Sequence, residues 1–365
     1  MTSNNINVKI CYFGDFRSDY ARNRVIIRGL QENGVEILFS NTSVRGWRKF
    51  VDLWRKYRSL KREFDIIVVG YSDSRFMIPF VRLISHRLFS GQAGKKIVWD
   101  AFYSLYDSWV LDRRLVGPGS LKAKYYWFLD WLSCKLADLI LLDTDAHISY
   151  FSKTFGIKNS KFIKVLVGTV DDMFYPKLIQ KTSSNFLVHF HGNFIPLQGV
   201  EYIIRAASLL NDHNIQFQII GQGQEYGKIK KIAEELNLKN ITWIGYVAYE
   251  ELSNYISKAD ICLGIFGKTE KTRRVIPNKA YEAIAMAKPL ISADTPAMQE
   301  LFTDRKDIMF CNLANSKDLA DKILELKNND NLRNEIAQSG YELFKEVAVP
   351  SRVVLPLVRF LRSTF

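Results

Sequence analysis

The repeated alternation of short apolar segments with segments of helical periodicity limits the fold of this chain more than any other feature. In the first half, apolar segments stand at 8–13, 66–70, 96–102, 139–144 and 162–168, and helical patterns follow the first two at 22–32 and 76–89. Segments that are apolar throughout are typical of parallel strands in a sheet that helices cover on both faces. The first half therefore predicts one doubly wound α/β unit.

The alternation starts again after a break. The pattern stops at 170–176, and the polar residues 177–185 predict a linker. Strand patterns return at 186–191, 216–220, 241–246, 261–266, 289–293 and 308–310, with helical patterns at 199–210, 224–236, 250–257 and from Pro277, and a helical tail follows. Since 365 residues exceed the usual length of one core, we expect two doubly wound units that face each other across a cleft.

Composition excludes several classes of protein. The chain is 47% hydrophobic and 24% charged, as is usual for a soluble globular protein, and its short apolar runs predict no membrane-spanning segment and no secretory signal. Cys11, Cys134, Cys262 and Cys311 are scattered without the paired spacing of a metal site, so neither disulfides nor zinc are expected. A cytoplasmic protein is therefore predicted.

The net charge of +13 lies mainly in the first half of the chain. Residues 1–180 carry 28 Lys and Arg against 17 Asp and Glu, which gives +11, whereas residues 181–365 carry 23 against 21, which gives +2. Such a basic field suits nucleic acid, anionic lipid or a phosphorylated substrate, and charge alone does not choose between them.

The segment 272–289 predicts an anion site. Pro277 suits the first turn of a helix, whose free amides and dipole attract phosphate, and Arg273, Arg274 and Lys279 add positive charge at that end. Glu282 stands further along the helix and can accept two hydrogen bonds from a vicinal diol such as ribose. The segment thus predicts a nucleotide-diphosphate pocket. A surface helix with a basic N-terminus is the less favourable alternative, because the dipole favours cations at the C-terminus.

Two glycine loops follow predicted strands. Gly14 begins a loop that should face the cleft, since ligands of open α/β sheets bind at the carboxyl ends of strands. Gly221 and Gly223 form only a G-x-G, which suits a turn as well as a ligand loop.

The second half resembles the retaining GT-B glycosyltransferases of family 4, the glycosyl transferases group 1, in which two Rossmann-like domains clasp a nucleotide sugar. The matching pieces are His-Gly-Asn-Phe-Ile-Pro-Leu-Gln-Gly-Val at 191–200, Ile-Ile-Gly-Gln-Gly at 219–223, Trp-Ile-Gly-Tyr-Val at 243–247, and Pro-Asn-Lys-Ala-Tyr-Glu at 277–282 with Lys-Pro at 288–289. The resemblance implies domains at 1–172 and 173–349, and a C-terminal helix at 350–365 that crosses back to the first domain.

By this resemblance, Glu282 binds the donor ribose, and 245–247 lie beside the base of a UDP- or GDP-linked sugar. The sequence departs from the family at Arg274, which replaces the first of its paired glutamates, and at Asn193 and Gln198, which replace an arginine and a lysine. We therefore expect basic residues near the helix start to neutralise the diphosphate without a metal. The expected donor-binding residues are Gly14, Gly192, Asn193, Gln198, Gly221, Tyr246, Val247, Arg273, Arg274, Asn278, Lys279 and Glu282.

The expected catalytic residues are Asp100, Asp107 and Arg274. The first two follow a predicted strand, where one of them would orient the acceptor hydroxyl, although a helix cap at Asp107 is an equal alternative. The family's histidine is absent from this loop. His189 and His191, at strand spacing, predict a hydrogen-bonded structural role rather than a catalytic one.

The segment 47–64 predicts a basic amphipathic helix. Aromatic and aliphatic residues recur every third or fourth position, with arginines and lysines between them. Packing in the core and docking on an anionic membrane surface are equal alternatives for its apolar side.

Together these features predict a retaining, hexosyl-type glycosyltransferase of polysaccharide biosynthesis at the cytoplasmic side, with peripheral membrane binding as an open question. Its acceptor would be a glycan or a polyprenyl-diphosphate-linked saccharide. A nucleotide-sugar epimerase on the same scaffold is the alternative. A basic nucleic-acid-binding protein is disfavoured, because no recognised motif accompanies the charge.

Overall fold

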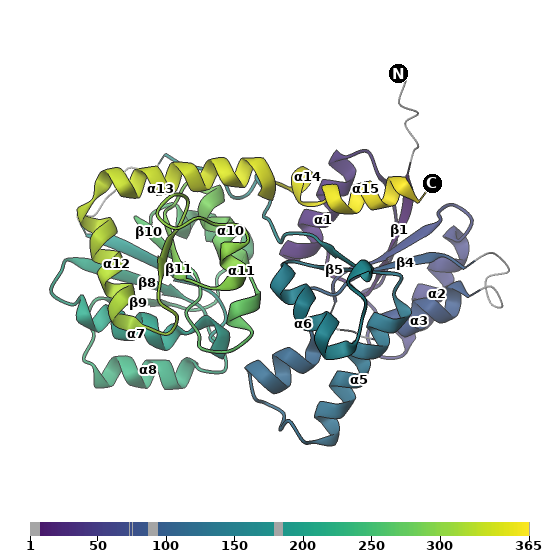
Figure 1. The fold of residues 1–365 in the computed structure, drawn as a ribbon, viewed down its shortest axis with the longest axis horizontal. Helices are drawn as coiled ribbons and strands as arrows, with labels where there is room; N and C mark the ends of the chain where they lie inside the picture. Colours follow the sequence, from purple (N-terminus) through teal and green to yellow (C-terminus); the bar gives the residue numbers. More distant parts are fainter. Residues whose placement is uncertain (1–7, 73, 75, 87–93, 179–184, 365) are drawn as a thin grey trace. The chain divides into compact units, whose positions relative to one another are not determined.

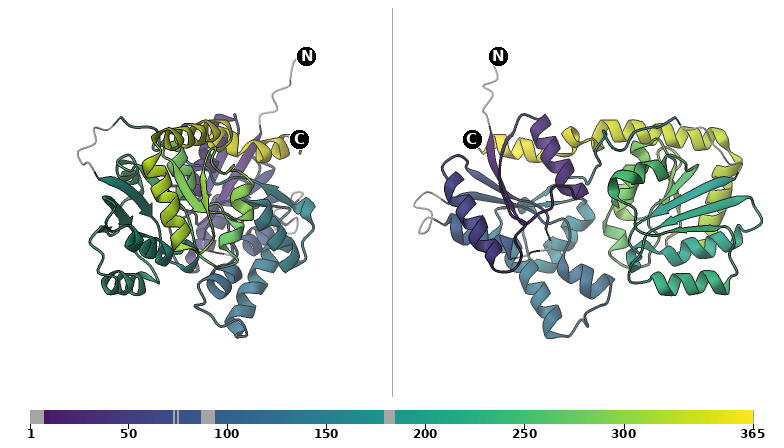
Figure 2. Two further views of the ribbon diagram at one scale, coloured as in Figure 1. Left: turned by 60° about the vertical axis from the view of Figure 1, so that its left-hand side comes forward. Right: turned by 180° about the vertical axis from the view of Figure 1, so that it is seen from behind.

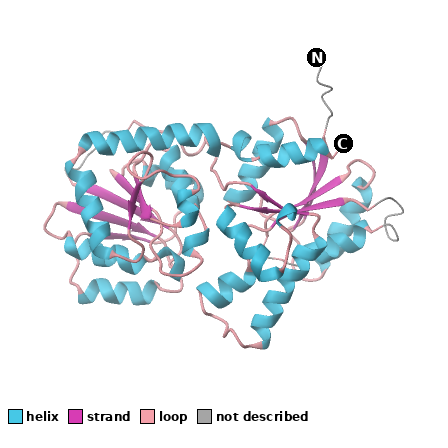
Figure 3. Ribbon diagram, viewed as in Figure 1, coloured by secondary structure: helices cyan, strands magenta, loops and turns pink. Residues whose placement is uncertain are grey.

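The computed structural model describes residues 8–72, 74, 76–86, 94–178 and 185–364, and the chain divides into two compact units (Figure 3). The first unit comprises Met1–Val110, Arg114–Val167 and Val349–Phe365, and the second comprises Leu111–Arg113 and Gly168–Ala348. The main segment of the second unit begins at Gly168, whereas the expected boundary was at 172. The expected linker at 177–185 and helix at 76–89 lie partly outside the described residues.

A parallel sheet with the strand order β2-β1-β3-β4-β5-β6 forms the centre of the first unit. Its strands are β1 (Lys9–Gly14), β2 (Glu36–Asn41), β3 (Ile66–Val69), β4 (Lys96–Asp100), β5 (Leu139–Leu142) and β6 (Phe162–Lys164). The helices of this unit are α1 (Ala21–Glu32), α2 (Arg48–Leu60), α3 (Met77–Ser85), the π-helix η1 (Tyr106–Asp112), α5 (Leu121–Leu136), α6 (Asp145–Phe155), the short η2 (Asn159–Lys161), α14 (Pro350–Val353) and α15 (Leu355–Ser363).

Helices cover both faces of this sheet (Figures 1 and 2). Apolar residues of α2, α3, α5 and α6 pack with strand residues in one core. Leu53 and Tyr57 of α2 are buried in that core, while Trp47 and Trp54 are 71% and 42% exposed. The apolar face of this predicted amphipathic helix is therefore a core face, and two tryptophans remain at the surface.

The second unit repeats the architecture with the parallel strand order β12-β11-β10-β7-β8-β9. Its strands are β7 (Phe186–His191), β8 (Ile215–Ile220), β9 (Ile241–Ile244), β10 (Ile261–Leu263), β11 (Leu290–Ala293) and β12 (Met309–Cys311). Its helices are η3 (Pro196–Gln198), α7 (Val200–Leu209), α8 (Tyr226–Glu235), η4 (Tyr249–Glu251), α9 (Leu252–Ile256), η5 (Thr272–Arg274), α10 (Asn278–Ala285), α11 (Pro296–Gln299), α12 (Ser316–Asn328), α13 (Asp330–Leu343) and the π-helix η6 (Phe344–Ala348).

The alternation of side chains along β7 divides its residues between two layers. Phe186, Val188 and Phe190 pack in a core with α7, α8 and α12. Because successive strand residues point to opposite faces, His189 and His191 face the other layer, where α10 and α13 are in contact (Figure 1). The two histidines are thus placed beneath α10.

The sequence pattern identified most strands but missed β2, α5 and α6. Strand β2 lies at the edge of its sheet and is mostly half-buried, so it lacks a continuous apolar run. Helix α5 carries aromatic residues around much of its circumference and has no clear polar face. Both lack the periodicity on which the prediction depended.

The C-terminal helices pack on the first unit, where α14 contacts α1. A Cβ atom added at Gly29 of α1 would lie 2.2 Å from the carbonyl oxygen of Pro350. Asn33 also donates a hydrogen bond to the carbonyl oxygen of Ser351 at 2.9 Å. The close approach of these helices therefore depends on glycine at position 29.

We expect Gly29→Ala to destabilise the first unit by about 1–3 kcal/mol, because the added methyl group overlaps backbone atoms of α14. In an open helix position the same change would stabilise the protein by roughly 0.5–1 kcal/mol. Amide hydrogen exchange of α1 and α14 is the measurement. Gly117→Ala, which has no atom within 4 Å of its new methyl group, is the control. Equal protection in both variants would contradict the packing described.

Candidate functional site

The strand order of the second unit has its topological switch point at β7. The chain runs outward from β7 to β8 and β9, and then crosses to β10 on the other side of β7. The loops after β7 and β10 both begin at this switch point, which is the position where open α/β sheets bind ligands.

Glycines hold the loop after β7 close to its neighbours. Gly192 has φ +149°, and a Cβ atom added at Gly221 would lie 2.0 Å from the carbonyl oxygen of Gly192. A Cβ atom at Gly223 would lie 2.6 Å from the amide nitrogen of Phe194. The glycine pair after β8 therefore allows a close backbone approach between this loop and the loop after β7.

Lys279 points from the start of α10 to the loop after β7. The helix begins at Asn278, with Pro277 as its N-cap. The Lys279 ammonium donates a hydrogen bond to Gln198 Oε1, and its nitrogen lies 3.7 Å from the centre of the Phe190 ring. A Cβ atom at Gly192 would lie 2.8 Å from that nitrogen, and the φ of +149° favours glycine at this position. Burial lowers the pKa of Lys279 well below its usual value, against an opposing effect of Glu282.

A chain of hydrogen bonds leads from Glu282 into the sheet. Glu282 Oε2 lies 2.7 Å from His191 Nε2, and His191 Nδ1 lies 2.9 Å from His189 Nε2. His189 Nδ1 lies 2.9 Å from Oε1 of Gln218, its cross-strand neighbour on β8. Glu282 is only 2% exposed. Both histidines have the hydrogen-bonded structural role that their spacing predicted.

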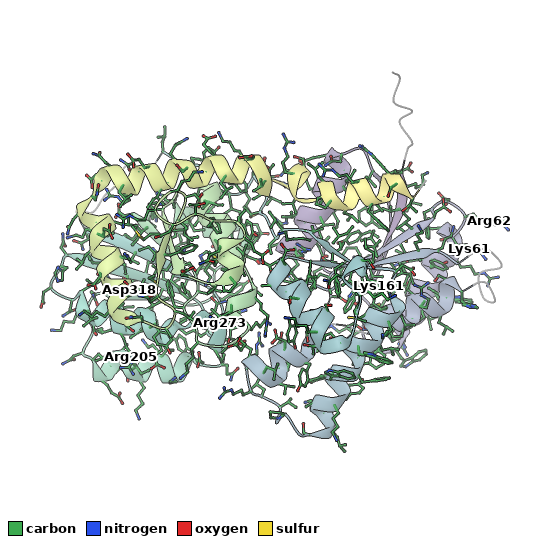
Figure 4. The ribbon with its side chains drawn as sticks, viewed as in Figure 1. Lys61, Arg62, Lys161, Arg205, Arg273 and Asp318 are labelled. Atoms are coloured by element: carbon green, nitrogen blue, oxygen red, sulfur yellow. The ribbon has the colours of Figure 1, made fainter. Side chains whose placement is uncertain are left out.

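The other expected donor-binding residues surround this buried group less tightly. Asn193 is exposed in the loop after β7, and Tyr246, with Val247 beside it, follows β9 and is 87% exposed. Arg273 and Arg274 end η5, just before α10. The Arg273 side chain is exposed and lies 3.9 Å from Glu270 (Figure 4). The described contacts bring Gln198, Lys279, Glu282 and Gly192 together, but they do not attach the two arginines to this group.

Asp100 is wrongly placed for the catalytic role that its position suggested. It ends β4 and is fully buried, and its carboxylate accepts hydrogen bonds from the Arg22 guanidinium at 3.0–3.2 Å. Arg22 also donates to the carbonyl oxygens of Val165 and Leu166. The pair ties α1, β4 and the segment after β6 together, so the described contacts give Asp100 a structural role in the first sheet.

Asp107 lies in the first turn of η1 and does not cap this helix. The Oγ atom of Ser104 accepts a hydrogen bond from the Asp107 amide at 3.0 Å and donates to Asp130 at 2.6 Å. Ser104 therefore has the capping role that was considered for Asp107.

The first unit has a cavity of about 490 Å³ at the carboxyl ends of β1 and β2. It is lined by the loops that follow these strands, at 15–19 and 41–46, and by Lys49. Gly14, with φ +136°, turns the chain into this loop. Lys49 bonds Asp15 at 2.6 Å and Ser74 at 3.0 Å. The second carboxylate oxygen of Asp15 is buried and has no hydrogen-bond partner in the described part of the chain.

Sequence reasoning missed Arg22, Asp15, Lys49 and Gln218. Gln218 was detectable as a polar residue in a largely apolar strand. The parallel register of the structure pairs it with His189. Arg22 gave no signal, since a basic residue in a first helical turn usually lies in solvent. Within the described residues, no helix has the length and hydropathy needed to cross a membrane, and no group of three or more His, Cys, Asp or Glu side chains suits a metal.

The buried histidine makes the stability of the second unit depend on pH. Burial, and then the neighbouring His191 and Lys279, lower the pKa of His189 well below 6.5. The folded state excludes a proton that the unfolded chain accepts, so stability is lost as the pH falls below about 6.5, by up to ~1.4 kcal/mol per pH unit. We expect His189→Gln to flatten this slope in denaturant unfolding between pH 8 and 5. His213→Gln, which changes an exposed histidine, should leave it unaltered. Parallel slopes for both variants would contradict this assignment.

The two-unit α/β architecture is the GT-B fold. The crystal structure of Alr3699/HepE from Anabaena in complex with UDP superposes with a TM-score of 0.70, over 98% of this chain and 100% of that chain, at 13% identity. At that identity the likeness establishes the fold alone.

The family-model match lies in the second unit. Residues 175–343 match the family model described as Glycosyl transferases group 1. An uncharacterized glycosyltransferase of Methanocaldococcus jannaschii is 31% identical over 157 residues, which are 43% of this chain and 42% of that protein. The poly(ribitol-phosphate) alpha-N-acetylglucosaminyltransferase of Staphylococcus aureus is 27% identical over 153 residues, 40% of this chain and 29% of that protein. The chain thus spans less than half the length of these two relatives.

Proposed function

We propose that this protein is a retaining glycosyltransferase that moves a hexosyl group from a nucleotide diphosphate sugar to a saccharide acceptor. One observation carries the proposal: Lys279, at the start of α10, points to the glycine loop after β7, and Glu282 is buried beside it. The match to glycosyl transferases group 1 covers the unit that holds this arrangement, and the HepE structure with the same fold binds UDP.

In this proposal the start of α10 and Lys279 hold the diphosphate. Departure of the nucleotide leaves negative charge on phosphate oxygens, and helix amides with an adjacent cation stabilise that charge. Arg273 and Arg274 precede α10 and would add to the field, and no metal is required. Glu282 would accept hydrogen bonds from the ribose hydroxyls, and exposed Tyr246 would offer a ring for the base, uracil or guanine.

We assign the acceptor to the cavity of the first unit. Its hydroxyl and amide groups, from Ser18, Asn41, Thr42 and Ser43, suit a saccharide, and Arg17 and Arg45 suit a phosphorylated one. Asp15 would take the orienting role considered for Asp100, because it lines this cavity. A glycan or a polyprenyl-diphosphate-linked saccharide fits these groups.

Isothermal calorimetry with UDP, GDP and the corresponding nucleosides tests the donor site. We expect one diphosphate to bind and Glu282→Gln to weaken it about tenfold or more, as for loss of a hydrogen bond to a charged group. Glu201→Gln, on the surface of the same unit, is the control. Absence of binding for both diphosphates would refute the proposal. The protein is then incubated, without an acceptor, with sugar derivatives of the nucleotide that binds. An epimerase would release an isomerised sugar under these conditions, whereas a glycosyltransferase would not.

We further propose that α2 contacts an anionic membrane surface with its outer side. Trp47 and Trp54 are exposed there among basic residues, and Lys61 and Arg62 follow the end of the helix (Figure 4). Each basic residue near such a surface contributes about 1 kcal/mol, and salt weakens the attraction.

Liposome sedimentation tests this contact. We expect binding that rises with anionic lipid content and that falls when Arg48, Arg55 and Arg58 are replaced by Gln, because these exposed cations would face the lipid. Lys230→Gln with Lys231→Gln in the second unit is the control. No binding at low salt, or equal binding of both variants, would argue for a soluble acceptor.

A further inference from the structure

The group that supports Glu282 is a continuous relay, which we define as Gln218, His189, His191 and Glu282. Three hydrogen bonds of 2.7–2.9 Å connect these four side chains from the middle of β8 to α10. His189 and His191 are 1% and 9% exposed, so neither exchanges its partner for bulk water. Each ring uses both nitrogens, and each of the three bonds needs one hydrogen.

Two arrangements of these hydrogens satisfy the three contacts. If the Gln218 amide donates to His189, each neutral ring passes one hydrogen onward, and His191 Nε2 donates to an ionised Glu282. If the Gln218 oxygen faces His189, His189 Nδ1 donates to Gln218 and His191 Nδ1 donates to His189 Nε2. Neither neutral ring then has a hydrogen left for Glu282, so one additional proton must lie between His191 and Glu282. His189 does not hold that proton, since burial and the nearby Lys279 oppose its charge.

The other charged or titratable groups near the relay do not replace this contact. Lys279 of α10 bonds Gln198, and the Cys262 thiol of β10 is buried, which raises its pKa to about 12. Among the described contacts, His191 is thus the side chain that holds the Glu282 carboxylate.

We propose that His191 is a positioning residue for donor recognition: its Nε2–H fixes the ionised Glu282 carboxylate in the orientation that receives the ribose hydroxyls. This inference rests on the proposed donor site and deepens it. A carboxylate held on one oxygen by a buried imidazole keeps the lone pairs of the other oxygen for the ligand. Without that support, Glu282 would lose its orientation, and recognition would lose its preference for ribose.

Two variants of His191 separate this role from packing. His191→Gln places an amide where Nε2 stands, so it keeps the contact with Glu282 and loses the one with His189. His191→Asn places its amide near Nδ1, so it keeps His189 and loses Glu282. The probes are UDP and GDP, each compared with its 2′,3′-dideoxy analogue by calorimetry. The ratio of the two dissociation constants measures recognition of the ribose.

We expect His191→Gln to keep the native ratio and His191→Asn to reduce it about tenfold. Equal ratios for the two variants, whether native or reduced, would overturn the proposal. If neither diphosphate binds the native protein, the donor site itself fails, and a second measurement decides on the relay. Nitrogen-15 spectra of the native imidazoles should show a protonated His191 Nε2 whose resonance shifts in Glu282→Gln. An unprotonated His191 Nε2 in the native protein would overturn the relay. Because this spectrum is recorded on the native protein, the result holds even if a variant does not fold.

Discussion

Asp100→Ala is expected to destabilise the first unit by about 3–5 kcal/mol, because it leaves the Arg22 guanidinium charged and buried without its carboxylate. Both side chains are completely inaccessible, so water does not replace the lost partner. The measurement is the free energy of unfolding, or amide exchange of β1 and β4 if the two units unfold separately. A catalytic aspartate would behave differently, since its replacement would lower turnover and leave stability nearly unchanged.

Two further variants isolate the buried charge as the cause. Glu32→Ala removes the partner of Arg28 on the same helix, where the side chains are 31% and 35% exposed, and should cost less than about 1 kcal/mol. Arg22→Met combined with Asp100→Leu removes both charges and should recover much of the loss. A loss as large in Glu32→Ala, or no recovery in the double variant, would contradict the explanation.

Lys279→Met is expected to change binding and stability in opposite directions. Loss of the ammonium should weaken nucleoside diphosphate binding by about 10–100-fold, because a charge-assisted contact with phosphate disappears. The free energy of unfolding should stay equal or rise, since burial penalises the ammonium and lowers its pKa in the folded protein. Methionine keeps the length of the side chain over the Phe190 ring.

Calorimetry with the diphosphate and with the bare nucleoside measures the first effect, and denaturant unfolding measures the second. The nucleoside should bind the native protein and the variant equally, because it lacks the phosphates. Lys288→Met is the control, since Lys288 lies beyond the other end of α10 and donates to the Ala259 carbonyl oxygen. An equal loss of nucleoside and diphosphate would place Lys279 away from the phosphates.

The sequence by itself determined the architecture and the neighbourhood of the candidate donor site. Buried parallel strands must be apolar along their length, so β1, β3 and β7 were visible as continuous runs, and the pattern predicted two doubly wound units. The start of α10 was equally visible, because proline and the cations near it are local features of the chain. The sequence also singled out Gly192 and Gly221, but it did not show the close backbone approach between them.

Tertiary structure decided which side chains contact one another. Asp100 meets Arg22, which is 78 residues away in sequence, and Glu282 meets His191, which is 91 residues away. The first contact joins the carboxyl end of β4 to the start of α1, and the second joins the carboxyl end of β7 to the middle of α10. No local periodicity encodes such a pair. The burial that makes Asp100 a structural residue, and that turns two histidines into a support for Glu282, results from packing of separate segments. The chemical role of each polar residue was therefore fixed by the fold, whereas its residue type and place along the strand or helix were fixed by the sequence.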